Sequence, residues 1–267
     1  MKSITTIALA LSLIGATATV AAAPAQRPTA ATSAKPTVVL VHGAFADSAS
    51  WNGVAAKLRA DGYTVIGAAN PLRSVKGDAA EVSGIVKSIA GPVVLVGHSY
   101  GGAVISTAAN GNPNVKSLVY VAAFAPEQGE TAIELSGRYP GSTLGPALAK
   151  PVPLADGGED LYIDQAKFHQ QFAADVPKAA AALMAFGQRP IAKAALTEAA
   201  GAPAWKNLPS YFIYGSADKN IPEAALRFMA ERAQSKNTVT IPGASHVVMT
   251  SHPAAVAKLI EQAAQAN

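Results

Sequence analysis

Apolar positions between residues 37 and 124 follow two patterns in turn. Continuous β-branched runs, typical of strands buried on both faces, are separated by segments whose apolar residues recur at helical spacing. In the first such segment Trp51, Val54 and Leu58 share one helix face. The alternation predicts strands at Thr37–Val41, Tyr63–Gly67, Val93–Val96 and Ser117–Ala122, with helices at Ser50–Ala60, Asp78–Ala90 and Tyr100–Asn110.

The pattern breaks after Phe124 and resumes near Tyr211. Residues from about 126 to 208 hold Gly/Pro-rich loops and Ala-rich stretches, which predict helices at Asp160–Ala174 and Pro177–Phe186 and no strand. Strands at Tyr211–Tyr214 and Thr238–Ile241 and helices at Pro222–Arg232 and Pro253–Ala264 complete the prediction. Because strands alternate with helices without hairpins, we expect an α/β fold of about six mainly parallel strands, helices on both faces and a helical cap inserted after the fourth strand.

The first residues have the features of an export signal. Lys2 precedes an apolar stretch that ends in small residues, so we expect a signal peptide over residues 1–25, cut after Ala22 or Ala25. An uncleaved anchor is the alternative, although Ser, Thr and Gly dilute the stretch. Residues 26–36 would then form a flexible linker and 37–267 the folded domain. We expect export to a bacterial periplasm or the medium, without stable membrane insertion after cleavage.

Composition narrows the classes of partner and cofactor. The formal net charge is only +4, and the sequence contains no Lys/Arg-rich run that could bind the phosphates of a nucleic acid. Nucleic acid is therefore not an expected partner. The absence of Cys excludes cysteine nucleophiles and thiolate zinc sites, and no H-E-x-x-H, Walker or G-x-G-x-x-G motif follows a strand. We therefore expect a monomer or homodimer that acts on a small molecule without metal or other cofactor.

One motif joins a predicted strand to a predicted helix. Residues 97–102 read Gly-His-Ser-Tyr-Gly-Gly, the form G-x-S-x-G of a nucleophile elbow. A sharp turn of this kind exposes the Ser99 hydroxyl at a helix N-terminus, where unpaired N–H groups stabilise negative charge. A glycine-rich turn capped by serine is the alternative, but the flanking elements favour a nucleophile.

With these residues the chain resembles the α/β-hydrolase superfamily. His42-Gly43-Ala44-Phe45, the elbow around Ser99, Asp218 and His246 match the family's motifs in order over essentially the whole mature chain. The strand that carries His-Gly opens the domain, as in the branch of small capped esterases, plant methylesterases and hydroxynitrile lyases, and exported bacterial homologues look closer still. The resemblance implies an α/β-hydrolase fold and a serine hydrolase.

A serine nucleophile needs a base that is itself oriented by an acid. Of the five histidines, His246 lies on the loop between the final strand and the last helix, where the family places its base. Asp218 follows the preceding strand and gives the family's chain order of Ser, Asp, His. Glu127 is the alternative acid, because some relatives carry the acid after the fourth strand.

The remaining site residues are expected around this triad. Tyr100 N–H should supply one donor of the oxyanion hole, and the resemblance points to Ala44 for the other, with Phe45 as the alternative. The substrate is expected to contact Phe45, Phe124, Phe168, Phe172 and Val247, a lining that favours apolar or aryl groups.

These features predict hydrolysis of small to medium carboxylic esters through an acyl-enzyme. Lactonases and perhydrolases share the same motifs and remain open. In hydroxynitrile lyases a Thr replaces the Gly of the His-Gly pair and a Lys follows the catalytic His, whereas this chain has Gly43 and Val247. A non-catalytic ligand-binding protein of the same fold is the alternative from another class.

Overall fold

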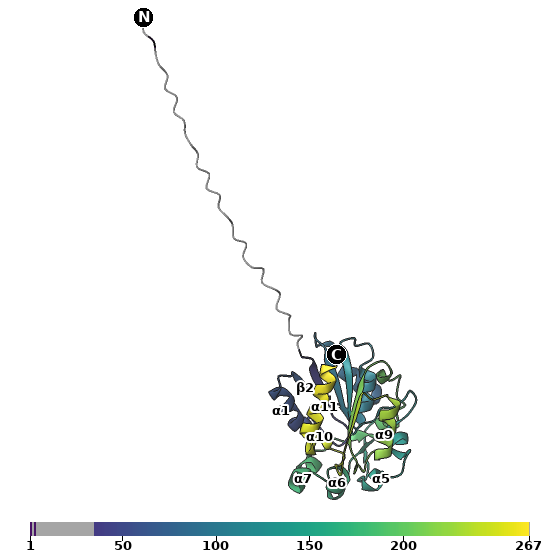
Figure 1. Ribbon diagram of the computed structural model, residues 1–267. Coiled ribbons are helices and arrows are strands. Elements are labelled where there is room, and N and C mark those ends of the chain that lie inside the picture. Colours follow the sequence, from purple (N-terminus) through teal and green to yellow (C-terminus); the bar gives the residue numbers. More distant parts are fainter. Residues whose placement is uncertain (2, 4–34, 267) are drawn as a thin grey trace. The chain divides into compact units, whose positions relative to one another are not determined.

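The computed structural model describes residues 1, 3 and 35–266, and residues 35–266 belong to one compact unit (Figure 1). The predicted signal peptide (1–25) and linker (26–36) therefore lie outside the described residues, apart from residues 1, 3, 35 and 36. In the part of the chain that the structure describes, no helix has both the length and the hydropathy to cross a bilayer.

Six parallel strands form the central sheet of this unit, in the order β2-β1-β3-β4-β8-β9. Their bounds are β1 Thr37–Val41, β2 Val65–Ala68, β3 Val93–His98, β4 Val115–Val121, β8 Ser210–Gly215 and β9 Asn237–Ile241. The predicted parallel sheet is confirmed. Strand β2 begins two residues later than predicted, because Tyr63 N–H still bonds to the carbonyl of Leu58 at the end of the preceding helix.

Helices cover both faces of the sheet. Their bounds are α1 Asn52–Ala60, α2 Val75–Lys87, α3 Tyr100–Ala108, α9 Glu223–Arg232, α10 Val248–Ser251 and α11 Pro253–Gln265, with a 3-10 helix at Ser48–Trp51. Helices α1 and α11 pack together on one face, and α2 packs against α3 on the other. The short helix α10 has no counterpart among the predicted elements.

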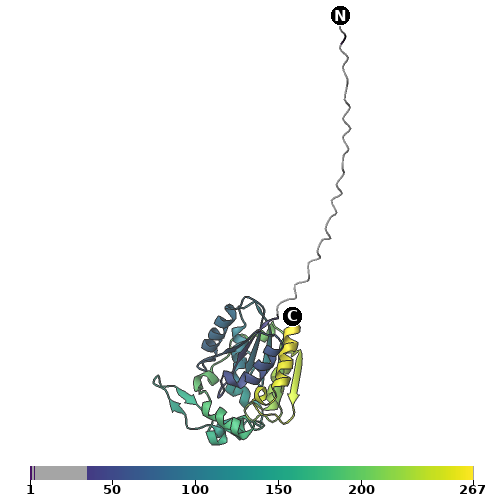
Figure 2. The same ribbon diagram turned by 90° about the vertical axis from the view of Figure 1, so that its left-hand side faces the viewer.

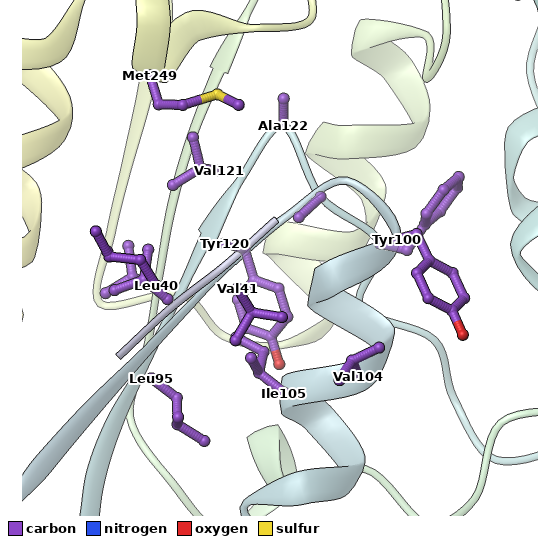
Figure 3. Packing of buried hydrophobic residues seen from close by; sticks show 14 of the residues in the cluster. Leu40, Val41, Leu95, Tyr100, Val104, Ile105, Tyr120, Val121, Ala122 and Met249 are labelled. Atoms are coloured by element: carbon purple, nitrogen blue, oxygen red, sulfur yellow. The ribbon is translucent and has the colours of Figure 1, made fainter. Parts of the chain in front are cut away.

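The core lies between the sheet and these helices. Val41, Tyr120 and Ile105, from β1, β4 and α3, are fully buried and gather beside α3 (Figure 3). The Tyr120 hydroxyl is satisfied there by the Ser106 hydroxyl at 2.7 Å. This packing fixes the start of α3, and with it the residue just before the helix.

The segment between β4 and β8 forms the cap. It contains α4 Ala132–Gly137, α5 Leu144–Ala147, α6 Gln165–Phe172, α7 Lys178–Gly187, α8 Lys193–Thr197 and a 3-10 helix at Ala204–Lys206. Helices α5, α6 and α7 lie at the end of the sheet toward which the strands run (Figure 1). The cap therefore covers the carboxyl ends of the strands, where open α/β sheets bind ligands.

The expectation of a strandless cap is wrong. Strands β5 Val152–Pro153, β6 Glu159–Leu161 and β7 Ile191–Ala192 form a small antiparallel sheet, and the β5–β6 hairpin projects from the unit in Figure 2. The helix predicted from Asp160 begins at Gln165, because the Asp164 carboxylate caps it by accepting the Ala166 N–H at 2.8 Å.

Candidate active site

Ser99 stands on a sharp turn between β3 and α3. Its backbone has φ 53° and ψ −124°, a conformation that L-residues rarely adopt. A Cβ on Gly97 would lie 2.5 Å from the Gly101 carbonyl oxygen, and one on Gly102 would lie 2.2 Å from that of Phe124. The turn therefore requires glycine on both sides of the serine, and this tight packing holds Ser99 in its strained conformation.

His246 and Asp218 form a buried pair on the two loops that follow β9 and β8. His246 Nδ1 lies 2.6 Å from Asp218 Oδ2, and both side chains are at most 1% exposed. The other carboxylate oxygen accepts the N–H groups of Asn220 at 2.8 Å and Ile221 at 3.0 Å. Because Nδ1 donates to the carboxylate, Nε2 is the unprotonated nitrogen, and it is buried without a partner among the described residues. This nitrogen is free to accept a proton.

His98 connects the elbow to the loop that carries His246. Its Nε2 donates to the His246 carbonyl at 3.2 Å, and the two rings lie 4.8 Å apart between centroids. Burial, together with the neighbouring imidazole of His246, holds the pKa of His98 well below its ordinary value. His98 is therefore a neutral group that ties the loop carrying His246 to the elbow, at the residue before Ser99.

The loop after β1 approaches Ser99 from the other side. A Cβ on Gly43 would lie 2.6 Å from Ser99 Cβ, so the loop passes directly against the serine. Phe45 N–H, the alternative donor to the oxyanion, already donates to the Arg189 carbonyl at 3.0 Å. It is therefore not available to a substrate. The N–H groups of Ala44 and Tyr100 donate to no acceptor in the described residues, and both residues line the cavity at Ser99. They are the two backbone donors available there.

His42 fixes the same loop through both ring nitrogens. Nδ1 donates to the Gly43 carbonyl at 3.0 Å, and Nε2 accepts the Asn70 N–H at 3.1 Å. The Asn70 side chain in turn donates to the His42 carbonyl at 2.9 Å. Burial lowers the pKa of His42. Asn70 lies on the connection after β2, and no motif in the sequence marks it as part of the site.

The other histidines and the alternative acid are engaged elsewhere. His169 Nε2 donates to the Val176 carbonyl at 2.9 Å, so this residue is half-buried rather than solvated on a helix. His252 occupies the N-cap position of α11, but its side chain makes no cap bond there and Nδ1 lies 2.9 Å from the Ser251 hydroxyl. Glu127 pairs with Lys206 at 2.7 Å, and that bond lowers the pKa of its carboxyl. Of the two candidate acids, Asp218 is the one that contacts His246.

A cavity of about 250 Å³ opens at Ser99 and the two backbone donors. Phe45 and Phe124 line it, as expected. The rest of the lining comes mainly from cap side chains that the sequence does not distinguish from ordinary helix residues: Ala132, Ile133, Ser136, Gly137, Ser142, Leu144, Gly145, Leu148, Leu161 and Leu196, with Asn220 and Ile221 from the loop after Asp218. The walls are largely apolar.

Three residues expected to contact substrate do not line this cavity. Phe168, Phe172 and Val247 are fully buried and lie behind its wall. The Phe172 ring packs 5.2 Å from the His246 ring and 4.9 Å from that of Phe168, measured between centroids. These aromatic side chains support the imidazole from the cap side instead of facing the cavity.

The described residues contain no group of three or more metal-ligating side chains arranged to hold an ion. Ser99 Oγ makes no hydrogen bond to His246 Nε2 in this structure. The site combines a serine on a strained turn, a buried imidazole held by a carboxylate, and two backbone donors. Such a set can transfer an acyl group by nucleophilic attack and general base catalysis.

Comparison with known proteins places this fold and site in a family. Residues 38–259 match the model described as "Alpha/beta hydrolase family". A carbendazim hydrolyzing esterase from Nocardioides sp. is 36% identical over 113 residues, which cover 36% of this chain and 46% of that enzyme. The chain thus spans about half the length of this relative.

Solved structures of two other proteins share the fold over most of the chain. Polyneuridine aldehyde esterase has a TM-score of 0.74 at 17% identity and covers 85% of this chain and 98% of its own. A pyrethroid hydrolase from Sphingobium faniae JZ-2 has a TM-score of 0.68 at 23% identity and covers 86% and 98%. The chain belongs to the alpha/beta hydrolase family.

Proposed function

We propose that this protein is a carboxylesterase-type serine hydrolase in which Ser99 is the nucleophile, His246 the base and Asp218 the orienting acid. One observation carries the proposal: the Asp218 carboxylate holds His246 Nδ1 at 2.6 Å in a buried site and leaves Nε2 unpaired. A base of this kind activates a serine hydroxyl, and the strained elbow presents one.

Each step of the proposed reaction can then be assigned to a residue of the site. As Ser99 Oγ attacks the ester carbonyl, its proton passes to His246 Nε2 and the carbonyl becomes an oxyanion that accepts the Ala44 and Tyr100 N–H groups. The bond to the alcohol oxygen breaks, and His246 returns the proton to that alcohol. Water then attacks the acyl-enzyme with His246 as base, which releases the acid and restores the Ser99 hydroxyl.

The cavity supports small to medium apolar or aryl substrates. Its volume of about 250 Å³ exceeds the ~150 Å³ of an apolar cavity that holds benzene. Its polar side chains, Ser136, Ser142 and Asn220, carry no charge. The names of the relatives, a carbendazim hydrolyzing esterase and a pyrethroid hydrolase, also support an ester-cleaving activity.

The alternatives on the same residues differ in how far the site supports them. A lyase-like Thr in place of Gly43 would put its Cβ 2.6 Å from Ser99 Cβ, so the present backbone does not accommodate it. Val247 is fully buried and supplies no cation beside the base. Lactonase and perhydrolase activities would proceed through the same acyl-enzyme, and a ligand-binding role would leave the free imidazole nitrogen unused.

Hydrolysis of p-nitrophenyl esters from acetate to palmitate tests the proposal. We expect turnover by the native protein, with an optimum at short to medium acyl chains, and a loss of at least roughly 10⁴-fold in Ser99→Ala. An unchanged thermal midpoint in the variant would show that the fold is intact. Equal rates in both proteins, or none in either, would contradict an esterase that works through Ser99.

A further inference from the structure

A second cavity, of about 270 Å³, lies beside the loop that follows β1. One wall is helix α7, which contributes Ala180, Leu183, Met184 and Gly187. These positions follow the spacing i, i+3, i+4, i+7, so one continuous face of the helix borders the space. The mechanism proposed above does not use this cavity.

Phe45 separates this cavity from the one at Ser99. It is the one described residue that lines both. Its backbone is fixed, with φ at 60° and the N–H bonded to the Arg189 carbonyl just beyond α7. Its ring meets the Phe172 ring edge-on, with 6.2 Å between centroids. A single aromatic side chain, next to the oxyanion donor Ala44, therefore stands between two spaces of similar size.

The polar side chains around the second cavity are already bonded to the protein. The Thr250 hydroxyl donates to the Ser50 carbonyl at 3.2 Å, and the Gln188 amide nitrogen donates to the Ile163 carbonyl at 2.9 Å. The Asp47 carboxylate accepts an N–H of the 3-10 helix and adds negative charge at this site. A ligand would find few free hydrogen-bonding groups, and an anion would be repelled, so the cavity suits an uncharged apolar group.

We propose that the second cavity is a substrate subsite, with Phe45 as the partition between it and the cavity at Ser99. It would take an aryl ring or alkyl chain on one side of an ester whose other apolar group fills the first cavity. This inference rests on the esterase function proposed above. The volume of about 270 Å³ accommodates a group larger than benzene, which needs ~150 Å³.

Filling the second cavity tests the subsite. Ala180 is exposed and lines the cavity, so Ala180→Phe should occupy it without disturbing the core. p-Nitrophenyl acetate needs one cavity, whereas p-nitrophenyl decanoate needs both. We expect Ala180→Phe to lower kcat/KM for the decanoate about tenfold relative to the acetate, mainly through KM.

Ala182→Phe is the matched control, because Ala182 is exposed on the same helix but lines neither cavity. It should leave the ratio of the two substrates unchanged. Equal effects of the two variants, or no effect of Ala180→Phe on the decanoate, would overturn the subsite.

A binding measurement separates this inference from the esterase proposal. The uncharged probe 6-propionyl-2-(dimethylamino)naphthalene should occupy two sites in Ser99→Ala, one in each cavity, and Ala180→Phe in that background should remove one of them. An unchanged stoichiometry would overturn the subsite. If the native protein hydrolysed no ester, the proposed function would fail, and the number of probe sites would still decide whether the cavity binds apolar groups.

Discussion

The loops around Ser99 and the cap above them differ in how closely their backbones are packed. A Cβ on Gly97, Gly102 or Gly215 would come within 2.1 to 2.5 Å of a backbone oxygen. At Gly137 and Gly187, in the described part of the cap, no neighbouring atom lies within 4 Å of such a Cβ. The reacting groups are thus set in a backbone without spare room, whereas the cap has open space around its helices.

The hydrogen bonds of the two regions differ in the same way. Both oxygens of Asp218 are bonded inside the protein. Besides the buried packing of Phe172 on His246, the cap contacts the rest of the unit through partly exposed groups, such as the ion pair of Arg73 with Asp160 at 2.6 Å. Exposed ion pairs contribute little to stability. The difference indicates that the residues proposed for catalysis lie in a tightly bonded backbone, whereas substitutions on the exposed surface of the cap should cost little stability.

The largest difference between the two regions is expected when one carboxylate in each is replaced by its amide and kcat is measured. Asp218→Asn removes the charge that holds His246 in its tautomer, so we expect kcat to fall by roughly 10³- to 10⁴-fold. Glu127→Gln, at the entry to the cap, should leave kcat within about twofold, because Glu127 contacts Lys206 and not the imidazole. Ester hydrolysis under substrate saturation measures both. A large loss in Glu127→Gln would reverse the assignment of the acid.

The next largest difference is expected in stability when one glycine of each region is replaced by alanine. Gly102→Ala forces its Cβ against the Phe124 carbonyl, so we expect the free energy of unfolding to fall by about 3 kcal/mol. Gly137→Ala has open space on helix α4 and should change stability by less than about 1 kcal/mol, toward greater stability. Urea denaturation distinguishes them. Similar losses in both variants would mean that the cap is packed as tightly as the elbow.

The smallest difference between the two regions is expected in how the free energy of unfolding changes as the pH is lowered. The pKa of His98 is depressed from its ordinary 6.5 by burial, so below that pH the unfolded chain binds a proton that the folded protein excludes. The free energy of unfolding should therefore decrease as pH falls from 6.5, by at most about 1.4 kcal/mol per pH unit for this group. His98→Gln should flatten that slope, while His169→Gln in the cap should not. Thermal midpoints between pH 7 and 5 provide the measurement, and parallel slopes in all three proteins would contradict it.

The central strands of the sheet were predictable because strands buried on both faces appear in the sequence as continuous apolar runs. A strand covered on both faces must be apolar throughout, so β1 is recognisable from five residues. Ser99 and Asp218 follow two buried strands, β3 and β8, and His246 follows the partly exposed edge strand β9. The carboxyl ends of parallel strands meet at one edge of the sheet. Their positions directly after strands of one parallel sheet therefore predict that the three residues lie close together, even without knowledge of their side-chain contacts.

The cap was less predictable for two physical reasons. Strands of two or three residues, such as β5 and β6, are too short to show a period, so their pairing is invisible in the sequence. Helical spacing shows that Phe168 and Phe172 are buried but not what they pack against. Phe172 packs against His246 and Phe168 packs against Phe172. Ile133 and Leu144, which have no distinguishing pattern, line the cavity instead.

The cap begins and ends on neighbouring strands. It leaves from β4 and returns at β8, and these two strands pair from Leu118 with Ser210 to Val121 with Ile213. The cap leaves at the carboxyl end of β4 and re-enters at the amino end of β8, so two adjacent strands of one sheet anchor its ends. An insertion held this way can be lengthened, shortened or replaced as a cassette without changing the register of any strand. Recombination at these two junctions would therefore exchange the substrate range, while the proposed nucleophile, base and acid are inherited intact.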